Sequence, residues 1–146
     1  MLFNKVLTEV PTGTWDVKAF DNDGACDWAY ELEEVDDLSV VEAALDNALT
    51  DAGVADACTA DCALAACEVI ARLKGNPGYH DAYTEEVDKW VAAHPIKPPQ
   101  PLVDRATAII DAILRDDSEV GQLWADSGKK DKWRAAVLDL KNRVIK

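Results

Sequence analysis

The fold class of this chain is decided by the segment TADCALAACEVIARLK, residues 59–74. Small and apolar residues recur in it at helical spacing, and we expect five side chains to face inward: Cys62, Ala66, Val69, Ile70 and Leu73. Gly75 and Pro77 follow directly and favour the end of a helix. The segment therefore predicts a helix that begins at Asp56 or Thr59 and ends near Lys74.

Two further helices are predicted before this segment. The first begins at Asp21 or Asn22 as N-cap and runs to about Glu34, and its apolar stripe consists of Ala25, Trp28, Ala29 and Leu32. The second begins at Ser39, which forms a capping box with the glutamate three residues later, and stops at Gly53. Beyond the first few residues of the chain, no segment predicts a convincing strand.

Four more helices are predicted after the segment. They are a short helix capped by Thr84, one over about residues 102–115, a short one capped by Asp117 or Ser118, and a last one over about residues 129–144. The last has Trp133, Val137, Leu140 and Val144 on one face. These patterns predict an all-α fold.

The rest of the chain suits a single domain. A length of 146 residues, of which 49% are apolar, fits one compact bundle of about six or seven helices over residues 1–146. Residues 1–14 are expected to form an extended arm. Residues 95–101 hold four prolines and are expected to form a stiff connector inside the domain.

Charge is distributed unevenly between the two halves. The chain has 28 acidic and 15 basic residues, but residues 1–73 hold 16 acidic and 3 basic ones. No lysine or arginine occurs over residues 19–71, a stretch with 14 acidic residues, whereas the last predicted helix is basic. An excess of acid argues against nucleic-acid binding and against docking on an anionic membrane.

Four of these acids form one stripe on the first predicted helix. At 100° per residue, one face opposite Trp28 and Leu32 holds the residues that we call the acidic stripe: Asp23, Asp27, Glu31 and Glu34. One interpretation is a solvated face, with the acidic half paired internally with the basic last helix. The other is a surface that steers a basic protein partner.

Other candidate residues lie close to this helix. Asp21, Asn22 and Asp23 could begin a metal site, but they lack the spacing of an EF-hand loop and fit helix capping better. Trp15 either closes the core over the first helix or belongs to a recognition surface. His80, in a loop beside an aspartate and tyrosines, is a weaker candidate for acid–base chemistry.

The cysteines and the N-terminus point to a reducing compartment. Neither a signal peptide nor a membrane-spanning run is evident, so we expect a cytoplasmic protein. Its four cysteines are then expected to be buried free thiols, because their spacing fits neither a zinc site nor a helical disulfide. We expect no cofactor and no bound metal.

Several motifs together resemble a known family. They are Gly13-Thr14-Trp15, Phe20-Asp21-Asn22-Asp23, Asp27-Trp28, Glu68-Val69-Ile70-Ala71, Val87-x-x-Trp90-Val91, Asp117-Ser118-Glu119, Leu123-Trp124 and Lys132-Trp133-Arg134. On these motifs the chain resembles domain of unknown function family 4259, and the resemblance extends from about Gly13 to Arg143. It departs from the family pattern at Asp16 and Lys18, where glycines are usual. The resemblance implies a helical fold and brings no activity.

Two functions are therefore carried forward. The first is a non-enzymatic acidic helical protein that binds a basic protein partner, as an immunity protein or inhibitor does. Its candidate binding residues are Trp15, Asp21, Asn22 and the acidic stripe. The alternative is a small metal-binding or hydrolytic protein that uses the carboxylates of Asp21, Asp23 and Asp27.

Overall fold

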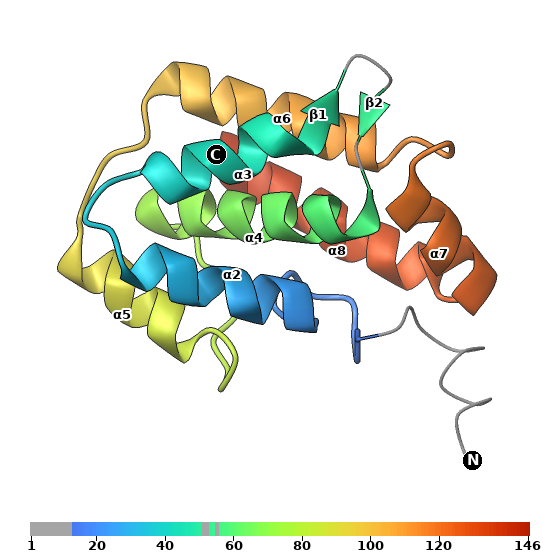
Figure 1. Cartoon of the computed structure of the whole chain (residues 1–146), viewed down its shortest axis with the longest axis horizontal. Helices are drawn as coiled ribbons and strands as arrows, with labels where there is room; N and C mark the ends of the chain where they lie inside the picture. The colour runs from blue at the N-terminus through green and yellow to red at the C-terminus, as the bar shows by residue number, and fades with distance from the viewer. Residues whose placement is uncertain (1–12, 51–52, 55) are drawn as a thin grey trace.

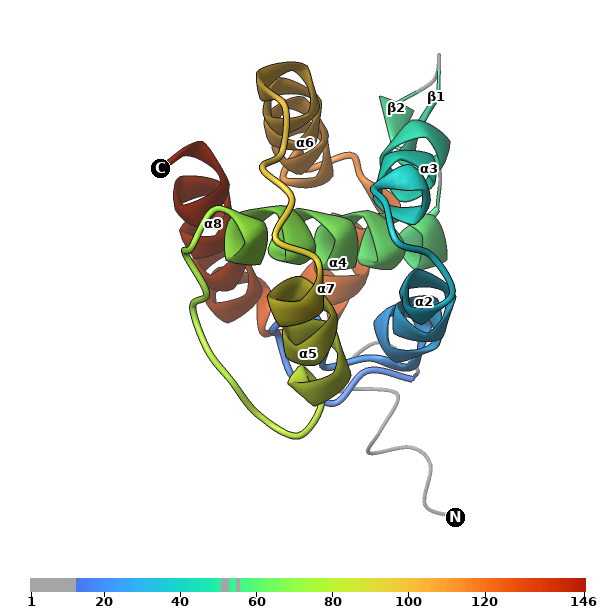
Figure 2. The same cartoon turned by 90° about the vertical axis from the view of Figure 1, so that its left-hand side faces the viewer.

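One helix lies at the centre of the structure, and the other helices pack around it. The structure is a computed structural model, and it describes residues 13–50, 53–54 and 56–146. Figures 1 and 2 show α4 (Ala57–Leu73) in the middle of the bundle. Packed against it are α2 (Asp23–Glu33), α3 (Ser39–Ala48), α5 (Glu85–Ala93), α6 (Gln100–Ile113), α7 (Glu119–Ser127) and α8 (Lys130–Ile145). The seven helices of this described part confirm the all-α prediction.

The central position of α4 follows from its small side chains. Every residue from Ala63 to Arg72 is buried, so this helix has no solvent-facing side over almost three turns. Its N-cap is Asp56, whose carboxylate accepts the Thr59 N–H at 2.8 Å, and Gly75 has a φ of +86° just past its end. The predicted bounds of this helix are confirmed.

The segment before α2 folds back on itself as a short loop. The N–H of Trp15 donates to the carbonyl of Asp21, and the N–H of Asp23 donates to the carbonyl of Gly13, each at 2.9 Å. Of the two predicted N-caps, the structure uses Asn22, whose Oδ1 accepts the Ala25 N–H at 2.7 Å. The start of α2 is thus held by local hydrogen bonds.

The predictions around α3 need correction. Ser39 forms no capping box, because its N–H and hydroxyl both donate to the carboxylate of Asp37 and the N-cap position is occupied by Leu38. The helix ends at Ala48 and does not continue to Gly53. Two short strands follow, β1 (Leu49–Thr50) and β2 (Gly53–Val54), which pair antiparallel with Leu49 opposite Val54. A φ of +115° at the glycine suits the turn side of this hairpin.

Two predicted details of the second half also differ. Thr84 occupies the predicted N-cap position of α5, but its side chain makes no capping hydrogen bond, because its hydroxyl donates to Asp88 and accepts the N–H of Asp81. The proline-rich connector ends at Pro99, and Pro101 lies in the first turn of α6, where a missing N–H costs no helical hydrogen bond. The connector runs past α4 and joins α5 to α6, which lie on opposite sides of α4 (Figure 2).

The last two helices match the sequence pattern. Ser118 caps α7 by accepting the Gly121 N–H at 3.1 Å. The predicted inner face of α8 is buried, and its members are Trp133, Val137, Leu140 and Val144.

Most of the predicted N-terminal arm, residues 1–12, lies outside the described residues. Within the part that the structure describes, no helix is both long enough and apolar enough to span a bilayer.

Enlarging a side chain on α4 tests its central position. Ala66 is fully buried, whereas Ala108 of α6 is exposed. We expect Ala66→Leu to lower the free energy of unfolding by about 1–3 kcal/mol or more, because the added atoms meet a packed core. Ala108→Leu, the matched control, should change it by less than about 0.5 kcal/mol. Urea denaturation measures both, and equal effects would contradict a fully enclosed α4.

Candidate functional site

The predicted site residues at the start of α2 divide into buried and exposed ones. Asp21 and Asn22 are buried, and their side chains are used within the loop: Asp21 accepts the Lys18 N–H at 3.0 Å, and Asn22 caps α2. Trp15 is 42% exposed, and its ring lies 4.9 Å from that of Tyr83. Trp15 therefore lies at the surface beside the loop before α5 and does not close the core.

The acidic stripe lies on the outer surface of α2. Its four carboxylates are exposed, and none takes part in the ion pairs formed among the described residues. Tyr30 projects from the same face and is 66% exposed. It was not among the residues predicted from the sequence to form a site. Next to the stripe, slight desolvation and a hydrogen bond with Glu86 raise the pKa of Glu33 above its usual value.

The basic residues of α8 do not neutralise the acidic stripe. This helix packs against α4, α6 and α7, and Figure 2 shows it on the side of α4 away from α2. Its lysines pair with Asp116 at 3.0 Å, Asp111 at 2.7 Å and Asp16 at 3.2 Å. Pairing of the acidic half with the basic helix is thus limited to residues outside α2 and α3.

A cavity of about 400 Å³ lies between the loop that precedes α2 and the helices α4, α7 and α8. Thr14, residues 16–19, α4, α7 and α8 supply its walls, together with Gly78 and Tyr79 of the loop after α4. Its apolar lining comes from Leu64, Val137, Leu140 and the rings of Trp124 and Trp133. The two indole rings are nearly parallel, with centroids 6.3 Å apart. This volume is in the range of small-molecule sites.

Asp61 places a carboxylate in this cavity. No hydrogen bond or ion pair joins it to any residue that the structure describes, and burial raises its pKa to about 7. In the sequence, Asp61 is one of the 14 acidic residues of the base-free stretch 19–71. The available signal was its position in an otherwise small and apolar part of α4; Asp61 is half-buried and lies just before the enclosed residues 63–72.

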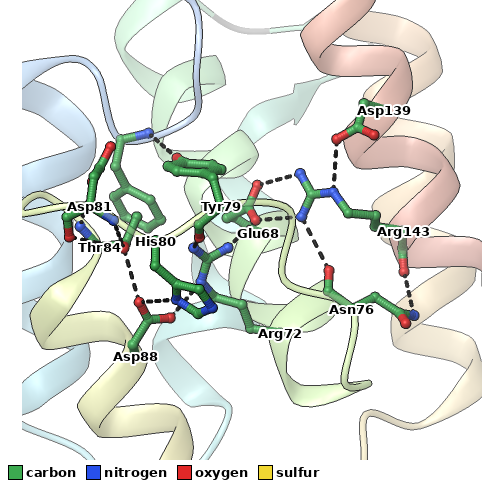
Figure 3. Close-up of polar contacts among 11 residues, drawn as sticks. Glu68, Arg72, Asn76, Tyr79, His80, Asp81, Thr84, Asp88, Asp139 and Arg143 are labelled. Atoms are coloured by element: carbon green, nitrogen blue, oxygen red, sulfur yellow. Dashed lines mark hydrogen bonds and ion pairs between the residues drawn. The ribbon is translucent and has the colours of Figure 1, made fainter.

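A cluster of charges forms one end of the same cavity (Figure 3). Glu68 of α4 accepts from Arg143 of α8 at 2.6 and 3.0 Å, and it also accepts from Arg72 one turn later on α4. We call these three residues the Glu68 cluster. The exposed fraction of the Glu68 side chain is 1%, so both guanidinium groups are needed to compensate its desolvation.

The Glu68 cluster extends to α5 and to the loop that holds His80. Arg72 donates to the Tyr79 carbonyl and, through Nε, to Asp88 at 2.8 Å. His80 is exposed, and its Nδ1 lies 2.8 Å from Asp88. Although partial burial acts to raise it, hydrogen bonds from His80, Arg72 and Thr84 hold the pKa of Asp88 below its usual value. These contacts make the cluster a connection between α4, α5 and α8.

The structure does not gather the predicted metal-binding carboxylates into a site. Among the described residues, no three histidine, cysteine, aspartate or glutamate side chains lie close enough to hold a metal ion. The four cysteines are free, as expected, but they are not all buried: Cys67 is buried, Cys26 and Cys62 are half-buried, and Cys58 is exposed. Cys58 is exposed because it lies in the first turn of α4, before the enclosed part of that helix.

Comparison with protein-family models identifies a family for this chain. The family model described as "Domain of unknown function (DUF4259)" matches residues 13–136, from the loop before α2 into α8. This result confirms the resemblance inferred from the sequence motifs. No curated protein and no solved structure matches the chain.

Asp61→Asn tests the desolvated carboxylate. Because the folded protein holds the Asp61 proton more tightly than the unfolded chain does, ionisation of this group costs stability as the pH rises from about 4 to about 7. The variant should therefore be more stable than the wild type at about pH 8, by at most about 4 kcal/mol, and nearly equal to it at about pH 4. Urea denaturation at both pH values measures the difference.

Asp27→Asn is the matched control for this measurement. It removes the same charge from an exposed position, so we expect the free energy of unfolding to change by less than about 0.5 kcal/mol at either pH. If Asp61→Asn raised the free energy of unfolding as much at pH 4 as at pH 8, the raised pKa of Asp61 would be contradicted.

Glu68→Gln tests the charge compensation in the Glu68 cluster. The change leaves two guanidinium groups without their shared carboxylate, and we expect it to lower the free energy of unfolding by about 3–5 kcal/mol. Asp46→Asn, which breaks the exposed pair with Arg105, should cost about 1 kcal/mol or less. Urea denaturation at neutral pH compares them, and a loss of similar size in both variants would be inconsistent with a buried cluster.

Proposed function

We propose that this chain, which belongs to the DUF4259 family, is a non-enzymatic interaction protein that binds a basic protein partner. The binding surface is the outer face of α2, with the acidic stripe at its centre. Such a protein would act as an immunity protein or inhibitor does, by covering a basic surface of its target. The observation that carries the proposal is an exposed row of four carboxylates without a cationic partner among the described residues.

The electrostatics of the whole chain support a basic partner. Its formal net charge is −13, and the five basic residues of α8, a third of the 15 in the chain, lie away from α2. An acidic face of this kind attracts a basic protein over about 10 Å at moderate ionic strength and accelerates its association. Surface acids that had internal partners would not provide this field.

Tyr30 supplies an anchor within the charged face. Most of its side chain is exposed, although tyrosine combines a large apolar ring with a hydrogen-bonding hydroxyl. Tyrosine and tryptophan are enriched among the residues that contribute most to binding, and charged groups around them contribute more to orientation and rate. Trp15 lies outside the acidic stripe, on the loop before α2, and is a second exposed aromatic candidate.

The alternative function has less support from the geometry. A metal-binding or hydrolytic site would need Asp21, Asp23 and Asp27 to converge on one ligand. Asp21 instead lies buried, with its carboxylate bonded to the loop backbone, while Asp23 and Asp27 project from the outer face of α2. No observation on these three residues favours a bound ion, so binding of a protein partner remains our proposal.

A charge-neutralised variant tests the proposed surface. Asp23→Asn, Asp27→Asn, Glu31→Gln and Glu34→Gln together remove the acidic stripe without changing its size. We expect at least a 10-fold loss of affinity for a basic partner captured from the native host by cross-linking and then purified. Wild-type affinity should also fall as salt is raised from about 50 to about 500 mM, because screening weakens exposed charges.

The matched control neutralises four exposed acids of the second half. Asp104→Asn, Asp117→Asn, Asp126→Asn and Asp131→Asn change the net charge equally, so any loss that depends on net charge alone appears in both variants. We expect the control to bind within about 3-fold of the wild type, an effect of long-range charge only. Equal losses in the two variants, or binding that ignores salt, would overturn the proposal.

A further inference from the structure

The cavity beside α4 contains one carboxylate that has no cationic partner among the residues that the structure describes. Four acids line the cavity, and three of them have cationic partners: Asp16 pairs with Lys132, and Glu68 and Asp139 pair with Arg143. Asp61 is the fourth, and within the described part of the chain it has neither a cation nor a hydrogen-bond donor. Asp61 is half-buried, and a carboxylate in such a position is stabilised by a cation that enters the cavity.

The cations that line the cavity are directed to other groups. The Lys18 ammonium lies over the Tyr79 ring, 4.8 Å from its centre, and the Arg143 guanidinium is shared between Glu68 and Asp139. Figure 3 shows Arg143 directed at these two carboxylates. A positive group that compensates Asp61 therefore has to come from outside the cavity lining.

The remaining walls favour a ligand with an apolar body. Leu64, Val137 and Leu140 contribute aliphatic surface, and Trp124 and Trp133 contribute aromatic surface. Indole faces also attract cations. A space of about 400 Å³ holds a small organic molecule and exceeds the needs of one inorganic ion or a few waters.

We propose that the cavity binds a free organic amine, in its ammonium form, with the charged nitrogen on the Asp61 carboxylate and an apolar or aromatic group against Trp124 and Trp133. This site is separate from the acidic stripe, which lies on the outer face of α2, and it does not depend on the proposed protein partner. Asp61 supplies charge recognition, and the apolar walls select against small hydrophilic cations.

Titration with 2-phenylethylamine tests the proposal on the full chain. This probe combines an ammonium group with an aromatic ring, and 2-phenylethanol is its neutral counterpart. At about pH 8, calorimetry and tryptophan fluorescence should show saturable 1:1 binding of the amine, at least 10-fold tighter than binding of the alcohol. Asp61→Asn should weaken amine binding by at least 10-fold and leave alcohol binding unchanged.

Two further variants locate the site. Asp27→Asn removes an equal charge from the outer face of α2 and should leave amine binding unchanged. Ala136→Leu fills part of the cavity from α8 and should weaken both amine and alcohol by at least 10-fold. Thermal melts confirm that each variant is folded. The proposal is overturned if the amine shows no saturable binding, if Asp61→Asn and Asp27→Asn bind it equally, or if the alcohol binds as tightly as the amine.

Discussion

The enclosure of α4 on all sides is the constraint on which the rest of this structure depends. A helix surrounded by six others needs small side chains, and five of the buried positions of α4 are alanines at 0% exposure: Ala60, Ala63, Ala65, Ala66 and Ala71. The same enclosure takes Glu68 and Arg72 out of solvent. Since an isolated buried charge is far too costly, these two residues require partners from other elements. Arg143, Asp88 and the Tyr79 carbonyl meet that need, and they fix α8, α5 and the loop after α4 in place.

This packing also decides which charges meet. The basic helix α8 lies against α4, α6 and α7, so its cations pair with Asp111, Asp116, Asp16 and Glu68. The acids of α2, on the opposite side of α4, receive none of them. The uneven charge of the sequence thus becomes an uneven charge of the surface. Asp61 is a separate case, because it lies half-buried on α4 just before the enclosed residues and faces a cavity, with no cation from the described part of the chain.

Local rules predicted the helices well where the signal lay within a few residues. Asn22, Asp56 and Ser118 accept hydrogen bonds from N–H groups three residues later, and the periodic apolar face of α8 is buried as its spacing indicated. Predictions failed where two local partners competed. Ser39 bonds to Asp37 instead of forming a capping box, and Thr84 bonds to Asp81 and Asp88. Pro101 was predicted to belong to the connector but lies in the first turn of α6, where the backbone N–H groups have no partner within the helix.

The sequence by itself determined the helical fold class, the ends of most helices and the concentration of acid in the first half, because helical periodicity, capping and composition act over a few residues or add along the chain. Only the tertiary structure decided that the acidic stripe forms no ion pair with the described residues, that Tyr30 lies on the same face, and that Asp61 faces a cavity beside two tryptophans. The physical reason is distance along the chain: Glu68 and Arg143 are 75 residues apart, and no local pattern specifies which distant groups the packing of helices brings together.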